Sequence, residues 1–286
     1  MSKKIIWLTS YPKSGNTWLR YLLSNYFFNK ENTFNFDIKN HINKFPSDIH
    51  FSFLNEYQKD EIIKKPEKIS KYLIKAQQQI NIKNNNVVFF KTHYPLIVLN
   101  NNSFTDEEAT LAIIHIVRDP RDVVVSYANF LDNDYDKVIE FVTSKKLTAR
   151  HEFKKHSLGF DLMGSWAFHY ASWKTGLIKI PRILIRYEDL LDDVNKEFTY
   201  LIKFLSKILK FSPDNNQLKF SIKNSEFVTL SKYEKKIGFS ESNLSNKLFF
   251  NKGEKKQWQF KLNTNQLKKI ENHFHKEMIE LGYINP

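Results

Sequence analysis

The sequence has no cysteine, and this absence removes several kinds of chemistry. Across its 286 residues, disulfides, thiolate metal sites and a cysteine nucleophile are all excluded. There is also no apolar run of the roughly 18 residues that a transmembrane helix requires, so no membrane span is expected. The first residues lead into only a short apolar run, which is not the pattern of a signal peptide. We therefore expect a cytoplasmic protein, which the lack of cysteine also fits.

Acidic residues are too few to balance the basic ones. The chain has 44 Lys and Arg against 31 Asp and Glu, a formal net charge of +13. Such a surface attracts nucleic acid, anionic lipid or a polyanionic small molecule. The lysines are spread along the chain, which favours an ordinary solvated surface over a nucleic-acid face. Hydrophobic residues make up 41% of the chain and include 25 Phe, enough for a sizeable core.

Short apolar runs alternate with helical patterns along the chain. Buried strands are predicted at 5–8, 87–91, 111–118 and 182–187. Helices are predicted at 18–27, 66–82, 120–130, 134–158, 161–177, from 189 to about 209, and at 214–223, 225–236 and 264–281. This alternation predicts an α/β fold with three layers, α/β/α, around a central and mostly parallel sheet. No linker or repeat interrupts the chain, so residues 1–286 are expected to form a single domain.

The loop after the first strand combines several groups that bind anions. Residues 11–18 read Tyr-Pro-Lys-Ser-Gly-Asn-Thr-Trp and lead directly into a helical pattern. A helix start offers free backbone N–H groups and a dipole that favours negative charge, so a phosphate-type ligand is one hypothesis. Lys13 stands before the only nearby glycine, so the Walker pattern is absent. An ordinary turn with a Thr or Asn cap is an equally good interpretation of this stretch alone.

Polar side chains follow three of the predicted strands. Lys13 comes after the first strand, the second ends in Lys91 with His93 two residues later, and the third ends in Arg118, with Ser126 two helical turns later. Because the carboxyl ends of parallel strands meet at one edge of a sheet, these groups can converge there. Arginine suits a phosphate, and the histidine can take up a proton near neutral pH. The set therefore predicts a nucleotide-like anionic ligand beside one general base.

Each of these residues also has a purely structural interpretation. Lys91 can extend from a strand end toward solvent, and Arg118 can pair with Asp119 or Asp122. A lone histidine such as His93, before a Tyr-Pro pair, is commonly a hydrogen-bonded turn residue. The two aspartates lack a His or Glu partner at ligand spacing, so no metal site is predicted.

Residues 11–18 closely resemble the 5′-phosphosulfate loop of the cytosolic-type sulfotransferases, a P-loop-like element. Residues 91–95 look like the catalytic Lys-Thr-His segment of that family, and residues 118–127 look like its 3′-phosphate segment. Further stretches resemble the family in the same order, at 164–173, 186–190 and 252–258. Together the matches cover nearly the whole chain.

The resemblance implies transfer of a sulfuryl group from 3′-phosphoadenosine 5′-phosphosulfate (PAPS) to a hydroxyl or amine of a small-molecule acceptor. The product of the donor is then adenosine 3′,5′-bisphosphate (PAP). The resemblance also implies that His93 is the general base and that Lys91 and Lys13 stabilise the transition state. The residues that it assigns to PAPS are Lys13, Ser14, Gly15, Asn16, Thr17, Trp18, Arg118, Ser126, Tyr187, Phe227, Lys252 and Gly253.

The chain departs from the family pattern at three places. Asn16 replaces the usual threonine of the first loop, and Asn251 stands where the family usually has arginine, just before Lys252 and Gly253. The stretch 253–258 lacks the second glycine that is common there. The short dimerisation segment of animal members is not visible, which leaves a homodimer open. Small polar residues between 238 and 256 predict a mobile loop.

Two other functions remain as alternatives. A nucleotide-dependent kinase on a related P-loop sheet would need the Walker pattern and a Mg²⁺-binding acid, and both are missing. A basic nucleic-acid-binding protein rests on the net charge alone. Aromatic residues either line an acceptor pocket for an apolar or aromatic alcohol or belong to the core, namely those at 34–57, Tyr94, those near Trp166 and those at 238–250.

Overall fold

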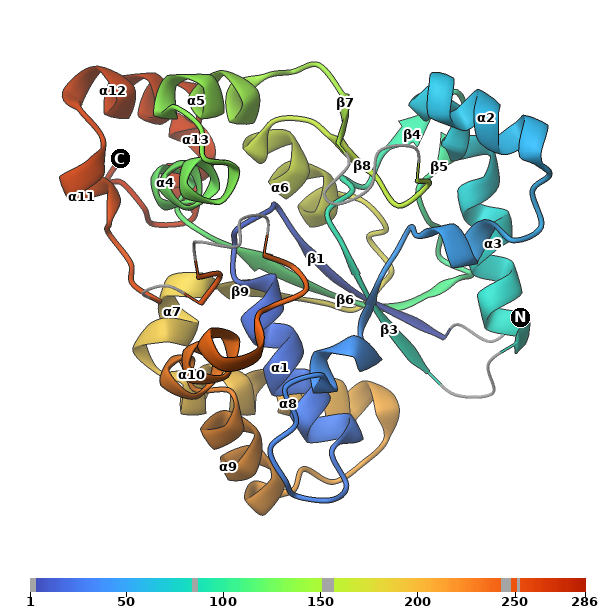
Figure 1. Ribbon diagram of the computed structural model, residues 1–286, viewed down its shortest axis with the longest axis horizontal. Coiled ribbons are helices and arrows are strands. Elements are labelled where there is room, and N and C mark those ends of the chain that lie inside the picture. The colour runs from blue at the N-terminus through green and yellow to red at the C-terminus, as the bar shows by residue number, and fades with distance from the viewer. Residues whose placement is uncertain (1–3, 84–86, 151–156, 243–247, 251–252) are drawn as a thin grey trace. The chain divides into compact units, whose positions relative to one another are not determined.

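A computed structural model describes residues 4–83, 87–150, 157–242, 248–250 and 253–286. One five-stranded sheet forms the centre of the fold. The strands lie in the order β2-β3-β1-β6-β9 (Figure 1). They span Asn43–Lys44, Val88–Thr92, Ile5–Ser10, Thr110–Val117 and Arg182–Arg186 in that order. Both β1 and β2 pair with β3 in parallel.

The four predicted strands are confirmed, with their ends shifted by one or two residues. Every residue of β1 is buried, as is nearly every residue of β6. Strands buried on both faces read as continuous apolar runs, which explains why sequence pattern alone located them. The register places Ile5 opposite Val88 and Thr9 opposite Thr92, so β1 and β3 end side by side.

The chain forms two compact units. The first unit comprises residues 1–11, 42–115 and 144–184, and the second comprises 12–41, 116–143 and 185–286. The chain passes from the first unit to the second directly after β1, between Tyr11 and Pro12. The prediction of a single domain stays a prediction.

The first unit is built around a cluster of buried aromatic rings. Tyr94 and Trp173 are fully buried, and the indole N–H of Trp173 donates to the Tyr94 carbonyl at 2.8 Å. The Tyr94 ring stacks on Phe104 at 5.2 Å between centroids, and Trp7 and Phe45 complete the group. Burying one such side chain stabilises the fold by roughly 1.5–3 kcal/mol. Tyr94 and Phe45 therefore belong to the core, one of the two roles that the sequence left open for them.

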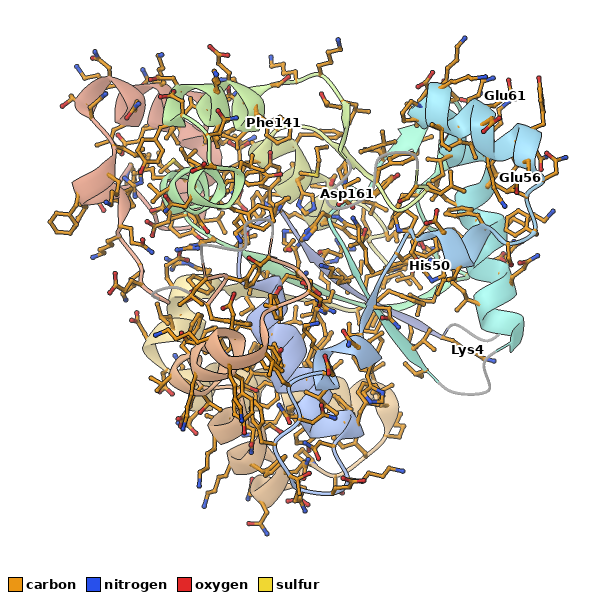
Figure 2. All side chains as sticks on the ribbon, in the orientation of Figure 1. Lys4, His50, Glu56, Glu61, Phe141 and Asp161 are labelled. Carbon is orange, nitrogen blue, oxygen red and sulfur yellow. The ribbon has the colours of Figure 1, made fainter. Side chains whose placement is uncertain are left out.

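Besides β2, the first unit holds four other very short strands that the sequence did not indicate. These form two antiparallel pairs, one of β4 (Val98–Leu99) with β5 (Asn102–Ser103) and one of β7 (Thr148–Arg150) with β8 (Asp161–Met163). The carboxylate of Asp161, labelled in Figure 2, forms an ion pair with Lys44 at 2.8 Å.

Two predicted helices are shorter than expected because of the pair β7–β8. The helix predicted over 134–158 ends at Thr143, and the one predicted over 161–177 spans Trp166–Thr175. The Ser165 hydroxyl accepts from the Phe168 N–H and so caps the start of the second helix. The remaining elements of the first unit are α2 (Glu56–Lys64), α3 (Ser70–Lys83), α6 (Trp166–Thr175), η2 (Asp48–Phe51) and η3 (Pro66–Ile69).

The second unit consists mainly of helices. Here α1 (Asn16–Phe28) packs against α9 (Asn215–Asn224) and against η1 (Ile38–His41). The other helices are α4 (Pro120–Leu131), α5 (Tyr135–Thr143), α7 (Tyr187–Asp192), α8 (Val194–Leu209), α10 (Phe227–Ile237), α11 (Trp258–Lys261), α12 (Thr264–His273) and α13 (His275–Glu280). Helix α12 contacts both α4 and α5 (Figure 1). Within the described residues, no helix combines the length and apolarity that a membrane crossing needs.

Candidate functional site

Helix α1 begins without a side-chain cap, directly after the loop that was singled out in the sequence. Gly15 is the N-cap residue, and it provides no side-chain cap. Ser14 is fully buried, and its hydroxyl has no hydrogen-bond partner among the described residues. The Thr or Asn cap of an ordinary turn is therefore not observed. A helix start without a side-chain cap and a buried hydroxyl without a partner among the described residues are features of a site that accepts an anion.

Glycine is required at position 15 for two separate reasons. Gly15 has a φ of 96°, in the left-handed region that other residues rarely adopt. A Cβ atom added there would lie 2.4 Å from Cδ2 of Tyr187, far closer than van der Waals contact. The backbone of the loop and the Tyr187 ring therefore pack directly together in the second unit.

The ammonium of Lys13 lies against two aromatic rings. Its Nζ atom is 4.2 Å from the centroid of Phe130 on α4 and 4.1 Å from that of Phe249. Such contacts hold a cation by electrostatic attraction to the ring face. Lys13 itself was predicted from the sequence, whereas Phe130 and Phe249 were missed because their spacing from position 13 shows no pattern.

Three rings that the family resemblance assigned to the donor lie together. Trp18 is 5.1 Å from Phe227 and 6.1 Å from Tyr187 between ring centroids. Its indole N–H donates to the Ser225 carbonyl at 2.8 Å, which fixes the ring. Gly253 lies against Phe227, because a Cβ added there would approach that ring to 2.9 Å. The predicted residues Trp18, Tyr187, Phe227 and Gly253 are thus brought together in one unit.

Arg118 connects the loop to these rings. Its guanidinium donates to the Lys13 carbonyl at 3.1 Å and to the Glu254 carbonyl at 3.0 Å. The guanidinium carbon is 4.5 Å from the centroid of Tyr187. Its Nε atom has no hydrogen-bond partner among the described residues. The group is therefore held by neutral carbonyls and a ring face, and its Nε–H is a donor suited to an anion.

The two aspartates that could have paired with Arg118 have other partners. Asp119 accepts from the Arg121 guanidinium at 2.7 Å, and Asp122 accepts from two backbone N–H groups. Ser126 lies on α4, as the helical spacing predicted, and is half-buried there. The predicted donor residue Lys252 and the family departure at Asn251 both lie outside the described residues.

The hydroxyl of Thr17 donates to a carboxylate. Its partner is Glu241, at 3.3 Å, and this acid also accepts from Arg20 at 2.6 Å. The Lys39 ammonium is 3.8 Å from the same carboxylate. Arg20 and Lys39 are both almost completely buried, so Glu241 compensates two buried cations. The sequence gave no signal for this acid, since it lies more than 200 positions from Thr17 along the chain.

In the first unit, a backbone carbonyl fixes the proton position of His93. The Nδ1 atom of His93 is 2.8 Å from the Ser10 carbonyl and 3.2 Å from the Ser10 hydroxyl. A carbonyl can only accept, so Nδ1 carries the hydrogen of the neutral ring. The lone pair is then on Nε2, where a base needs it. Lys91, two residues earlier at the end of β3, is buried like His93.

Two other histidines of the first unit do not share this arrangement. His115 and His169 are buried, with their rings stacked 5.6 Å apart, and Nδ1 of His115 contacts the Thr9 hydroxyl at 2.6 Å. Burial lowers the pKa of His115 to about 3, and it lowers the pKa of His169 well below the ordinary value. Both rings therefore stay neutral near pH 7 and act as structural residues.

Comparison with known proteins identifies the family. The sulfotransferase domain model matches residues 3–282, so the chain belongs to this family. It is 28% identical to Sulfotransferase 2A1 of Macaca fascicularis, over 53% of this chain and 48% of that protein. It is 30% identical to Sulfotransferase 1E1 of Homo sapiens, over 70% of this chain and 58% of that protein. The chain thus spans about half the length of the curated relatives that it matches.

Solved structures show the same fold. Retinol dehydratase, in complex with androsterone and the inactive cofactor PAP, has a TM-score of 0.61 at 16% identity, covering 97% of this chain and 81% of that one. A mouse sulfotransferase complexed with PAP has a TM-score of 0.57 at 19% identity, covering 97% and 86%. The prediction of a three-layer α/β/α fold around a mostly parallel sheet is confirmed. Family membership does not favour the kinase alternative.

Proposed function

We propose that this protein is a PAPS-dependent sulfotransferase that acts on the hydroxyl or amine of a small molecule. The observation that carries the proposal is the donor cradle of the second unit. There an uncapped helix start, the buried Ser14 hydroxyl and the Arg118 guanidinium adjoin three clustered rings. An anionic nucleotide needs these three kinds of group, for its phosphates and for its base.

In this proposal the second unit binds the donor. Backbone N–H groups of residues 14–17 hold the 5′-phosphate, with Lys13 beside the bridging oxygen. Arg118, Ser126 and Lys252 hold the 3′-phosphate, and Gly253 is a further donor-binding residue. The rings that flank the adenine are Trp18, Tyr187 and Phe227. The PAP molecules bound in the two related structures support an adenosine bisphosphate as the ligand.

The proposed chemistry is an in-line transfer of the sulfuryl group. Nε2 of His93 takes the proton of the acceptor hydroxyl while the acceptor oxygen forms a bond to sulfur. The bond between sulfur and the bridging phosphate oxygen breaks, and PAP leaves with that electron pair. Lys91 and Lys13 neutralise the charge that grows on the sulfuryl and bridging oxygens. The contact of Nδ1 with the Ser10 carbonyl supports His93 as the base, because it leaves Nε2 unprotonated.

The proposed acceptor is an apolar or aromatic alcohol. Support comes from retinol dehydratase, which was solved in complexes with androsterone and with retinol. We also propose a cytoplasmic location, no nucleic-acid partner and no resident metal, and a homodimer remains open. Light scattering of the purified chain would determine its oligomeric state.

A direct assay tests the reaction. The protein is incubated with PAPS and a panel of apolar alcohols, phenols and amines, and sulfated products are detected by mass spectrometry together with released PAP. We expect a sulfated product with at least one alcohol and none without enzyme. Phosphorylated product in a parallel incubation with ATP and Mg²⁺, and no sulfated product, would support the kinase instead.

A further inference from the structure

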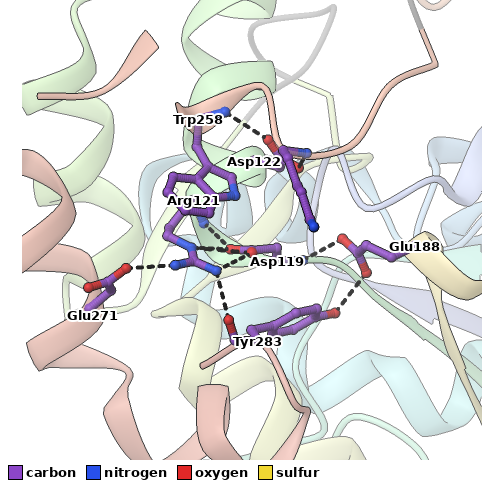
Figure 3. Close-up of polar contacts among 8 residues, drawn as sticks. Asp119, Arg121, Asp122, Glu188, Trp258, Glu271 and Tyr283 are labelled. Carbon is purple, nitrogen blue, oxygen red and sulfur yellow. Dashed lines mark hydrogen bonds and ion pairs between the residues drawn. The ribbon is translucent and has the colours of Figure 1, made fainter. Parts of the chain in front are cut away.

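The carboxylate of Asp122 is bonded to the backbone of a distant loop. Its two oxygens accept from the N–H groups of Lys256 at 2.7 Å and of Trp258 at 3.1 Å (Figure 3). Asp122 is 1% exposed, so these bonds are shielded from water. Burial raises the pKa of this carboxyl, and the charge of Arg118 and the two N–H groups act in the opposite direction. One buried side chain thus fixes both ends of the stretch 256–258.

Two neighbours of Asp122 hold the same loop. The Arg118 guanidinium donates to the Glu254 carbonyl at 3.0 Å. The Arg121 guanidinium carbon lies 3.9 Å from the centroid of the Trp258 indole. The segment 118–122, which leads into α4, therefore anchors the loop at three points, through residues 118, 121 and 122. We refer to residues 253–258 as the late loop.

The anchoring residues are themselves held rigidly. Arg121 donates to Asp119, to Glu271 at 2.6 Å and to the Tyr283 carbonyl at 2.9 Å (Figure 3). Glu188 in turn accepts from the Asp119 N–H at 2.9 Å. A guanidinium with this many partners cannot easily change its position. The start of α4 is therefore held rigidly, and the late loop is bonded to it.

The late loop begins at the donor cradle. Gly253 has a φ of 60° and lies against the Phe227 ring, and Arg118 contacts both the loop and the Lys13 carbonyl. A displaced late loop would therefore move Gly253 away from the ring and remove one partner of Arg118. Holding such a segment in its binding conformation beforehand lowers the entropic cost of binding.

We propose that Asp122 is a positioning residue for the donor, which keeps the late loop closed against the cradle before PAPS arrives. The inference rests on the proposed function and assigns to Asp122 a role that does not involve contact with the ligand. It makes a prediction opposite to that of simple electrostatics. Neutralising an acid near an anion site should strengthen binding of the anion, whereas releasing the loop should weaken it.

The variant Asp122→Asn tests this difference. The amide keeps one acceptor oxygen and turns an NH₂ group toward the second backbone N–H. We expect the dissociation constant of PAP, measured by calorimetry, to rise about 10-fold or more, the scale of a lost hydrogen bond to a charged group. With PAPS as substrate, KM should rise more than kcat falls. Asp122→Glu, which keeps the charge, should recover part of the affinity.

A matched control comes from the same loop. The side chain of Lys255 contacts Asp192 at the surface, where both groups are partly exposed. Exposed pairs of this kind contribute little, so Asp192→Asn should leave PAP binding unchanged. Hydrogen exchange of the ligand-free protein gives a second readout. Amides of 254–258 should exchange faster in Asp122→Asn and at the wild-type rate in Asp192→Asn, with the rest of α4 unaffected in both.

The outcomes separate the two proposals. If wild-type protein fails to bind PAP, the proposed function is wrong, and the donor role of Asp122 is wrong with it. If wild-type protein binds PAP and Asp122→Asn binds it equally or more tightly, only the positioning role is wrong. Weaker binding together with faster exchange in 254–258 supports the proposal, and weaker binding with unchanged exchange there contradicts it.

Discussion

The donor cradle of the second unit and the histidine of the first unit are organised differently. The cradle collects groups from five separate segments, and each is fixed by at least one contact to another, as in Arg118 with the Lys13 carbonyl. The proposed base is one histidine, and its Nδ1 atom contacts the carbonyl and the hydroxyl of Ser10. Binding is thus distributed over many groups, whereas proton transfer is concentrated in one. Single substitutions should therefore reduce binding gradually and remove turnover abruptly.

We expect the largest effect from His93→Ala, which should reduce turnover and leave donor binding unchanged. Losing a general base commonly lowers the rate by about 10²–10⁴-fold. Because His93 is not part of the cradle, PAP should bind this variant as it binds the wild type. Turnover with PAPS and calorimetry with PAP measure the two effects. His275→Ala, an exposed histidine on α13, is the control and should change neither quantity. Normal turnover by folded His93→Ala would show that another group is the base.

Acid should destabilise the first unit through its buried histidines. Burial lowers the pKa of His50 to about 4, from 6.5 for a free histidine. Between about pH 6.5 and pH 4 this residue therefore binds fewer protons in the folded than in the unfolded state, and its contribution to stability is lost as the pH falls through that range. Each such group contributes a slope of up to about 1.4 kcal/mol per pH unit.

Urea unfolding between pH 7 and pH 5 measures this slope. His50→Gln should make it shallower, because the amide can still accept from the Ser47 N–H but does not titrate. The exposed His275→Gln should keep the wild-type slope. An unchanged slope in His50→Gln would mean that His50 does not titrate differently in the folded and unfolded states.

Gly15→Ala should lower the affinity for PAP by roughly 10- to 100-fold. A side chain at φ 96° costs of order 1–3 kcal/mol, and here its Cβ also meets the Tyr187 ring at 2.4 Å. Gly238→Ala is the matched control, because Gly238 also has a positive φ but an added Cβ has nothing within 4 Å. It should lower the stability by a similar amount, of order 1–3 kcal/mol, and leave PAP binding intact. Equal binding losses in both variants would show that backbone strain alone matters.

A smaller effect of opposite sign is expected from Glu241→Gln. Its carboxylate accepts from the Thr17 hydroxyl, which the proposed function assigns to the donor. Removing a negative charge beside a bound phosphate should tighten PAP binding by about 3- to 10-fold, in line with roughly 1 kcal/mol for charges about 4 Å apart in water. Glu226→Gln, an exposed acid at the start of α10, should have no effect. Weaker binding in Glu241→Gln would mean that its contacts with Arg20 and Lys39 support the cradle.

The sequence predicted those parts of the molecule that have a local pattern. Four of the five sheet strands are apolar runs and were found, whereas the two-residue strand β2 was missed. The loop at 11–18 was singled out by its own sequence. The pair β7–β8 was missed because strands of three residues are too short to show a period. Its formation in place of a continuous helix also explains the two helices that were predicted too long.

Contacts between distant residues could not be predicted in this way. His93 contacts the backbone carbonyl of Ser10. Every residue has such a carbonyl, so the sequence does not indicate which one becomes the partner. Asp122 was considered only as a partner of Arg118 or as a metal ligand, because its bonds to Lys256 and Trp258 join segments more than 130 positions apart. Phe249 approaches Lys13 only after the chain has folded.

The most direct test of the account compares PAP with AMP in calorimetric titrations of the wild-type protein. The two ligands share the adenine, the ribose and the 5′-phosphate, so their difference isolates the 3′-phosphate that Arg118 is proposed to hold. A charged pair in a partly buried site predicts that PAP binds at least about 10-fold more tightly than AMP. Arg118→Ala should remove most of that difference. Equal affinity for PAP and AMP in the wild type would contradict the assignment of this cradle to PAPS.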